Sequence, residues 1–398
     1  MSGAAKGRAG GAVFTAGRAI PPPFAQEHED LRASLRRFVE AELHPHADAW
    51  ERECWFPSEL FPRMGALGFL GLKYEEAYGG QGGGYLHDAI LAEELARCGS
   101  GGVAAGLGAH ITIATPPVWK FGTEDQKQRY LVPSIAGTKI AALGITEPDA
   151  GSDVAGLRTH AKAVDGGWVL NGSKTYITNG VRADYVVMAV KTTPEGGHGG
   201  ISFFLVDSGQ PGYTTSKLEK LGWHASDTAL IALDDVFVPS ENLLGELHGG
   251  FKLIMANFQW ERLSMALGAV AGAEFVVERA LRYALERTAF GRPIGSFQAI
   301  RHKFAEMATT IEAGRALTYH ALRLFVEGQN AIQEVTMAKL ATQRAAFDIA
   351  DTCLQIHGGV GYMVEYGIER AARDARLGPI GGGTDEIMKE ILGRTMGL

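Results

Sequence analysis

The chain is poor in cysteine: Cys54, Cys98 and Cys353 are the 3 cysteines among its 398 residues. Their number is odd, and their spacing matches neither a disulfide framework nor a metal site, so no metal is expected. Few, unpatterned thiols are typical of a reducing compartment. We therefore expect the cytoplasm of a bacterium or, in a eukaryote, the mitochondrial matrix.

Long apolar runs and an excess of basic residues are also missing. No stretch is long and apolar enough to span a bilayer, and the formal net charge is -7. A chain of this charge has no general surface for nucleic acid or an acidic membrane, and we expect neither as a partner. Residues 1–25 are rich in Gly and Ala without the apolar segment of a signal peptide. We interpret them as a flexible tail, with an organellar transit segment as the alternative.

Two helical regions enclose one β region. From residue 26 to 136 apolar side chains such as Leu31, Leu35 and Phe38 recur at helical spacing. From 137 to 249 short segments rich in β-branched and aromatic residues alternate with turns. From 250 to 398 the helical period returns. The sequence therefore predicts an α+β fold of three domains with these boundaries.

Some elements can be placed more closely. Asp165-Gly166-Gly167 predicts a hairpin turn, and Thr123 predicts the N-cap of a helix. The C-terminal helices are expected at residues 251–287, 298–327, 332–357 and 384–396. In the first of them, one apolar stripe is expected from Phe251, Ile254, Met255, Phe258 and Met265.

Five short blocks carry the polar and glycine-rich motifs. They are ITEPDAGSD (145–153), GSKTYITNG (172–180), RTAFGRPIGSFQ (287–298), QIHGGVGY (355–362) and GGGTDEIMKEI (381–391). Taken singly, each block is compatible with a turn, a strand end or a hinge. In the last block Thr384 predicts a helix N-cap whose free N–H groups can meet an anionic ligand, and the glycines before it allow close approach or an unusual dihedral angle.

In this order and at these separations, the blocks resemble the acyl-CoA dehydrogenase family from about residue 26 to the end. The resemblance implies an N-terminal helical domain, a middle β-barrel and a C-terminal four-helix bundle. It also implies bound FAD, an acyl-CoA substrate and a homotetramer, a dimer of dimers in which the flavin's pyrophosphate and adenine lie partly on a neighbouring subunit. An electron-transferring flavoprotein is the implied electron acceptor, in fatty acid metabolism.

Carried over position by position, the resemblance assigns FAD contacts along most of the chain. Tyr176 would cover a face of the ring system, where many relatives have Trp, and Arg287 would hold the pyrophosphate through its bidentate fork. Glu386 stands where some relatives have Gln. The full implied set is Thr146, Ser152, Tyr176, Thr178, Arg287, Phe290, Gln298, Gln355, Gly359, Thr384 and Glu386.

The position of the catalytic base departs from the best-known branch of the family, whose glutamate stands at the position of Gly382. The isovaleryl- and long-chain-type branches instead have Gly there and a base in a Glu-Arg-Leu context, which matches Glu261 here. From periodicity alone, Glu261 could equally be a surface residue or the partner of an arginine. The resemblance assigns the base to Glu261 and a thioester-binding backbone N–H to Gly382. Contacts with substrate are expected from Ser152, Phe258, Arg262 and Gly381, although Arg262 could instead form a structural salt bridge.

The expected reaction is FAD-dependent α,β-dehydrogenation of a saturated long-chain or branched acyl-CoA to the trans-2-enoyl-CoA. Glu261 would take the α-proton, and the β-hydrogen would leave as hydride to flavin N5. Burial should raise the pKa of Glu261 toward the working pH. The alternatives are an acyl-CoA oxidase that uses O₂, or a non-catalytic protein that binds flavin or a CoA thioester.

Overall fold

The computed structural model describes residues 20–193 and 197–398. The first region is a group of short helices. At the start of one of them the Thr123 hydroxyl accepts from the N–H of Gln126, and the side-chain oxygen of Gln126 accepts from the N–H of Thr123, as predicted for an N-cap. The helices are α1 (Gln26–Phe38), α2 (Ala47–Glu53), α3 (Leu60–Ala66), α4 (Gly84–Leu95), α5 (Gly101–Gly108), α6 (Thr115–Phe121), α7 (Glu124–Gln126) and α8 (Val132–Ile135).

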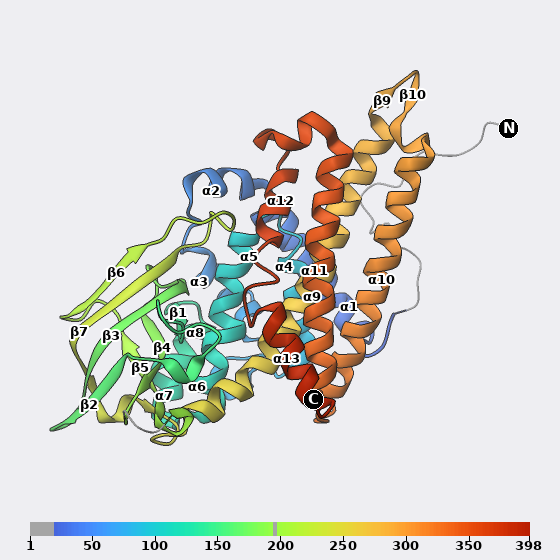
Figure 1. The fold of residues 1–398 in the computed structure, drawn as a ribbon. Coiled ribbons are helices and arrows are strands. Elements are labelled where there is room, and N and C mark those ends of the chain that lie inside the picture. The colour runs from blue at the N-terminus through green and yellow to red at the C-terminus, as the bar shows by residue number, and fades with distance from the viewer. Residues whose placement is uncertain (1–19, 194–196) are drawn as a thin grey trace.

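The second region is one eight-stranded sheet, seen at the left of Figure 1. Its strands are β1 (Ala141–Gly144), β2 (His160–Val164), β3 (Gly167–Thr178), β4 (Tyr185–Lys191), β5 (Ile201–Asp207), β6 (Tyr213–Lys217), β7 (Thr228–Pro239) and β8 (Leu243–Leu244). The order is β6-β7-β3-β2-β4-β5-β8, with β1 parallel to β4. Strands β2 and β3 form the hairpin predicted at Asp165-Gly166, where Gly166 has φ +77°.

The third region is a bundle of long helices (Figure 1). It comprises α9 (Gly250–Glu286), α10 (Gln298–Val326), α11 (Ile332–His357), α12 (Ile368–Ala375) and α13 (Asp385–Thr395). A hairpin of β9 (Thr288–Ala289) and β10 (Arg292–Pro293) joins α9 to α10. The ends of the four predicted helices agree with the structure within one residue because long apolar periodicity defines them, with the Thr384 N-cap added for α13.

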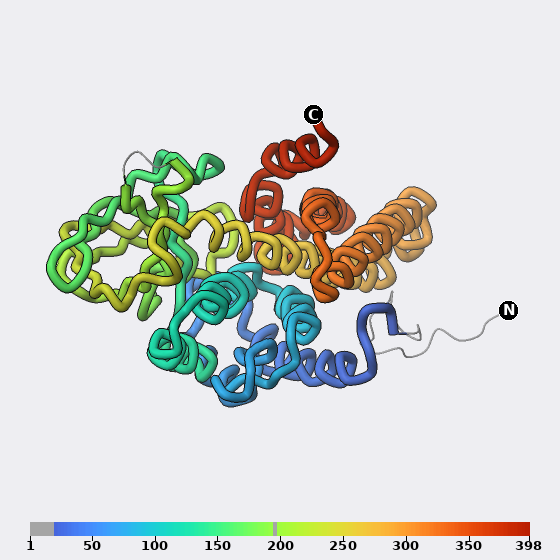
Figure 2. The backbone as a smooth tube through the Cα atoms, turned by 90° about the horizontal axis from the view of Figure 1, so that it is seen from below, coloured from blue at the N-terminus to red at the C-terminus, as the bar shows by residue number. Residues whose placement is uncertain are grey.

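Helix α9 runs through the middle of the molecule, between the N-terminal helices and the other C-terminal helices (Figure 2). Small residues allow it to lie close to α4: a Cβ added to Gly268 or Gly272 would be 3.8 Å from atoms of Ala92 or Ala96. Because one continuous core joins the N-terminal helices, one side of the sheet and α9, the side chains of α9 are held rigidly relative to both.

Three expectations about local structure were incomplete or wrong. Strand β6 and helix α12 were not predicted, because both are short and their apolar patterns are weak. The expected flexible tail at residues 1–25 lies mostly outside the described residues, but Phe24 is buried against Tyr319, so one aromatic side chain anchors the chain before α1. The third concerns the apolar stripe of α9.

The predicted apolar stripe of α9 is divided between the protein core and an open side. Ile254 is buried in the core, whereas Met255 is 42% exposed and Phe258 is only half-buried. The core is also contacted by Trp260 and Leu263, which the predicted stripe did not include. Helix α9 therefore has apolar side chains, such as Met255 and Phe258, that the protein core does not cover and that a ligand could contact.

Candidate active site

Glu261 lies on this second, partly open side of α9. The residue retains some exposed surface, but its Oε2 atom is buried and has no hydrogen-bond partner among the described residues. No ion pair to Glu261 is found in the described part of the chain either. Burial raises the pKa of Glu261 to about 7, against the opposing effect of the nearby Arg262 and Lys339 charges. A carboxylate in this condition can both hold and release a proton near neutral pH.

The glycine loop before α13 lies directly beside this carboxylate. Gly382 has φ +63° and Gly383 has φ +98°, values that L side chains rarely adopt. A Cβ added to Gly382 would be 3.7 Å from Glu261 Oε1 and 2.5 Å from Met265 Sδ. Any larger residue at 382 would therefore be strained and would fill the space in front of Glu261. The predicted N-cap is present, since the Thr384 hydroxyl accepts from the N–H of Ile387 at 3.3 Å.

Two cations also contact this loop. The Nε of Arg262, whose guanidinium lies over the Phe258 ring, donates to the carbonyl of Gly382 at 3.2 Å. Arg262 has no carboxylate partner in the described part of the chain, so the structural salt bridge considered above is absent there. The second cation is Lys339 of α11, which donates to the carbonyl of Gly383. The sequence analysis missed Lys339, although its position four residues after the buried Val335 was a usable signal.

The β domain reaches the same area through the end of β3. Tyr176 is 71% exposed with φ +60°, at an irregularity of the β3–β7 pairing, so its ring is presented at the surface. Thr178 is half-buried at the end of β3, Thr146 accepts from the N–H of Thr175, and Ser152 is exposed in the following turn.

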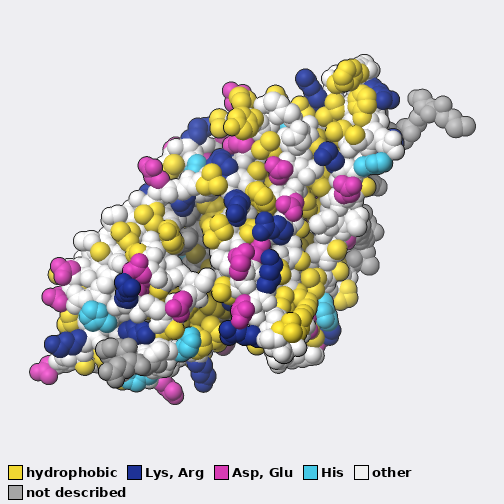
Figure 3. Space-filling view, in the orientation of Figure 1, with side chains coloured by type: hydrophobic (Ala, Val, Ile, Leu, Met, Phe, Trp, Pro, Cys, Tyr) yellow, Lys and Arg dark blue, Asp and Glu magenta, His cyan; other side chains and the backbone are white. Residues whose placement is uncertain are grey.

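Two side-chain amides link the end of β3 and helix α9 to the same helical segment between them. The amide of Asn179 donates to the carbonyl of Gly106 in α5, at 2.8 Å. The π-helical turn Ala109–Ala114 continues α5, and its Ile113 carbonyl accepts from Asn257, one turn before Glu261 on α9. The Tyr176 end of the sheet and the Glu261 part of α9 therefore lie on either side of α5. Figure 3 shows a hollow with apolar walls between the sheet and the C-terminal helices.

The remaining predicted residues lie at the opposite end of α9. Arg287 follows the last residue of α9 and is exposed, Phe290 is 95% exposed at the tip of the β9–β10 hairpin, and Gln298 begins α10. Gln355 and Gly359 are exposed at the end of α11. This end of α11 lies against α9, because Tyr283 stacks on His357, 4.3 Å between ring centroids.

The 26 residues from Glu261 to Arg287 span about 39 Å of helix. The structure thus separates the predicted residues into two groups, one around Glu261 and one around Arg287. Thr384 and Glu386, at the start of α13, are near the Glu261 group.

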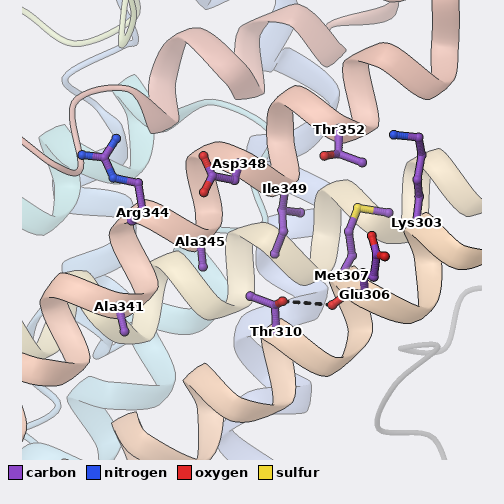
Figure 4. A pocket seen from close by; sticks show the side chains of 10 residues that line it. All are labelled: Lys303, Glu306, Met307, Thr310, Ala341, Arg344, Ala345, Asp348, Ile349 and Thr352. Atoms are coloured by element: carbon purple, nitrogen blue, oxygen red, sulfur yellow. Dashed lines mark hydrogen bonds between the residues drawn. The ribbon is translucent and has the colours of Figure 1, made fainter.

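A groove of about 340 Å³ between α10 and α11 is not part of either group (Figure 4). Its lining includes the carboxylates Glu306 and Asp348 and the cations Lys303 and Arg344, and contains none of the predicted site residues. The chemistry is assigned to the Glu261 region, because the glycine loop and the predicted residues lie there and not in this groove.

Comparison with known proteins agrees with this arrangement. The sequence matches the N-terminal, middle and C-terminal domains of acyl-CoA dehydrogenase over residues 25–138, 142–236 and 248–397. The chain belongs to the acyl-CoA dehydrogenase family. It is 40% identical to an acyl-CoA dehydrogenase of Bacillus subtilis over 93% of this chain and 97% of that protein.

Two further relatives span most of the chain. The long-chain specific mitochondrial acyl-CoA dehydrogenase of Sus scrofa is 40% identical over 93% of this chain and 86% of its own. An acyl-CoA dehydrogenase structure from Geobacillus kaustophilus superposes with a TM-score of 0.92 at 40% identity, over 95% of this chain and all of the other. The predicted fold class and enzyme class are therefore confirmed.

FAD is the cofactor of this family. The residues present fit such a group: an aromatic ring exposed on a strained backbone at Tyr176, a glycine loop that a Cβ would close, and an unpaired guanidinium at Arg287 are each ready for a ligand. In the described part of the chain, no cluster of His, Cys, Asp and Glu could hold a metal ion. No described helix has the length and apolar character needed to cross a bilayer.

Proposed function

We propose that this acyl-CoA dehydrogenase converts a saturated long-chain or branched acyl-CoA to the trans-2-enoyl-CoA, with Glu261 as the base. The observation that carries the proposal is the buried, unpaired Glu261 carboxyl with a pKa of about 7, beside a glycine loop. A base whose pKa lies near the working pH is effective, because a large fraction of it is ionised and its affinity for the proton is still high.

The chain's own groups would divide the work as follows. Glu261 removes the α-proton of the thioester and holds it. The N–H of Gly382 stabilises the negative charge that develops on the thioester oxygen, an interaction that strengthens in the transition state. FAD, which Tyr176, Arg287 and the other predicted contacts would hold, would supply the hydride acceptor for the β-hydrogen, so that the carbon–carbon double bond can form.

The substrate class follows from the space around the reacting carbons. Gly381 and Gly382 replace larger side chains there, and this leaves room for a long chain or for a branch near the carboxyl end. Phe258 supplies an apolar surface beside Glu261, and Arg262 and Ser152 supply polar ones.

We further propose a homotetramer, a dimer of dimers, in which the Arg287 group serves the FAD of a neighbouring subunit. The separation of about 39 Å along α9 supports this, because an FAD placed by its ring at Glu261 has no use for an arginine so far away in the same chain. The exposure of Arg287, Phe290 and Gln298 fits the same assignment. The three domains are proposed to be residues 26–136, 137–249 and 250–398.

The proposed electron acceptor is an electron-transferring flavoprotein, and the proposed compartment is the bacterial cytoplasm or the mitochondrial matrix. The alternative of an acyl-CoA oxidase predicts rapid turnover with O₂ alone. Steady-state rates with O₂, compared with rates with an electron-transferring flavoprotein, distinguish the two.

The test of the base is Glu261→Gln. The variant should retain yellow FAD but lose flavin absorbance ~10²–10⁴-fold more slowly than wild type when a long-chain acyl-CoA is added without oxygen. Glu274→Gln, a second buried glutamate on α9, is the matched control and should keep the wild-type rate. An equal rate in Glu261→Gln removes Glu261 from the role. A wild-type protein that no acyl-CoA bleaches is a non-catalytic binding protein.

A further inference from the structure

Three lysines are fully or nearly fully buried in the described part of the chain, and one of them differs from the other two. Lys73 donates to Asp88, and Lys174 donates to Glu147, each at 2.6 Å. Both lysines therefore form buried ion pairs, in which the carboxylate compensates for the water that the ammonium loses on burial. Lys339 is equally buried, at 0% exposure, but has no ion-pair partner among residues 20–193 and 197–398.

The ammonium of Lys339 is directed at backbone instead. Its Nζ donates to the carbonyl of Gly383 at 2.5 Å, 44 residues further along the chain. Burying an ammonium without a paired carboxylate is costly, so a helix core would be served better by an apolar residue at this position. The contact needs a reason beyond the stability of α11.

That reason lies in the loop that Lys339 contacts. Arg262 of α9 donates to the carbonyl of Gly382, so two cations from two helices hold two consecutive carbonyl groups. On the other side of the loop, the N–H of Gly381 donates to the carbonyl of Leu377 at 2.8 Å. Because each peptide unit is planar, these contacts together restrict the direction of the backbone through Gly382, whose own φ is otherwise unusually free.

The group left over in this arrangement is the N–H of Gly382. It has no acceptor among the described residues, although the neighbouring Gly381 N–H and both carbonyls are engaged. It stands beside Glu261, since a Cβ on Gly382 would be 3.7 Å from the carboxylate. A free donor next to a base is the arrangement that enolate formation requires.

We propose that Lys339 is a positioning residue, which holds the Gly382–Gly383 backbone so that the free N–H of Gly382 meets the thioester oxygen of the substrate. The inference rests on the proposed function. Lys339 does not itself touch substrate, because its ammonium is engaged with Gly383. Its positive charge, with that of Arg262, also favours the negative charge that the enolate carries.

The experiment separates this effect from overall activity by using acetoacetyl-CoA, whose acidic α-carbon can be deprotonated without hydride transfer. The bound ligand is titrated with pH, and the enolate is followed by its absorbance. In Lys339→Met the apparent pKa of the bound ligand should rise by about one unit, a smaller effect than the ~10²–10³-fold loss of an oxyanion donor itself. FAD content and thermal midpoint are measured on the same samples. If Lys339→Met does not fold, Lys339→Leu, which also removes the donor and the charge, carries the same test.

Lys73→Met is the matched control, since it removes an equally buried ammonium far along the chain from the loop. It should lower the thermal midpoint and leave the ligand titration unchanged. A Lys339→Met titration identical to wild type, or an equal shift in Lys73→Met, overturns the proposal. A wild-type protein that forms no enolate at any pH counts against the proposed function instead.

Discussion

The two ends of α9 differ in how far their side chains are enclosed by the rest of the chain. At Glu261 the side chain is surrounded by the glycine loop, Arg262 and Lys339, all from the same chain. At Arg287 the helix ends in a hairpin whose aromatic residue Phe290 is 95% exposed. The comparison teaches that the side chain at the Glu261 end is enclosed by groups of its own chain, whereas the side chains at the Arg287 end are presented to solvent.

The two ends of α9 also differ in how many charged side chains lie close together. The Glu261 region holds two cations and one carboxylate close together, so each charge alters the pKa of the others. Arg287 is exposed and has no ion-pair partner in the described part of the chain. Changes at the first end should therefore affect proton transfer, and changes at the second should affect how firmly the cofactor is retained.

Arg287→Ala should give the largest effect at the Arg287 end of α9. Removal of a bidentate, charge-assisted contact to pyrophosphate should weaken FAD binding by about 10- to 100-fold. The measurement is FAD retained after dialysis, followed by titration of the apoprotein with FAD. Arg292→Ala on the same hairpin is the control, because the Arg292 guanidinium already lies over Phe297 within its own chain. Unchanged FAD affinity in Arg287→Ala would remove the proposed contact.

The pH dependence of kcat/KM tests the other end. With a pKa of about 7, Glu261 is mostly protonated below neutrality, and only the ionised form accepts the α-proton. The value of kcat/KM should therefore fall about tenfold between about pH 8 and about pH 6, with the change centred near the pKa of the free enzyme. Use of an α-deuterated acyl-CoA checks that proton removal contributes to the rate. A flat profile in this range would indicate a base with an unshifted pKa or a different slow step.

Most of this contrast could be predicted from the sequence, for a physical reason. Long apolar periodicity defines α9 and α11, the Thr384 N-cap defines the start of α13, and the glycine run before Thr384 indicated unusual backbone, which Gly382 and Gly383 do adopt. Glu261 was assigned as the base only through the family resemblance, which pairs a glutamate at its position with a glycine at 382. Spacing along a helix gives the side on which a residue lies but not what covers that side.

The remainder depended on contacts between segments far apart in the sequence. Lys339 was missed because a lysine on a helix is usually solvated, and nothing near it in sequence shows that Gly383 will lie above it. The apolar stripe of α9 illustrates a related point: Ile254 and Phe258 both belong to it, yet only Ile254 is fully buried in the core. An apolar side chain kept for a ligand looks the same in sequence as one kept for packing.

The smallest predicted effect concerns stability, and its sign follows from the same pKa. Burial raises the pKa of Glu261 from 4.5 to about 7, so between these values the folded chain binds more protons than the unfolded chain. The free energy of unfolding therefore decreases as pH rises through this window, and the loss is complete above it. Glu261→Gln cannot ionise, and it should exceed wild type in stability by about 1–3 kcal/mol at about pH 8.

Near pH 4.5 the same comparison should vanish, because wild-type Glu261 is then protonated in the folded state. Thermal midpoints of wild type and Glu261→Gln across this range, with equal FAD loading, measure the difference. Glu286→Gln, the exposed last residue of α9, is the control and should follow wild type at every pH. A Glu261→Gln variant that is less stable than wild type at about pH 8 would mean that the folded chain stabilises the ionised carboxylate. The cations around the loop would then outweigh burial, and Glu261 would be a weaker base than proposed.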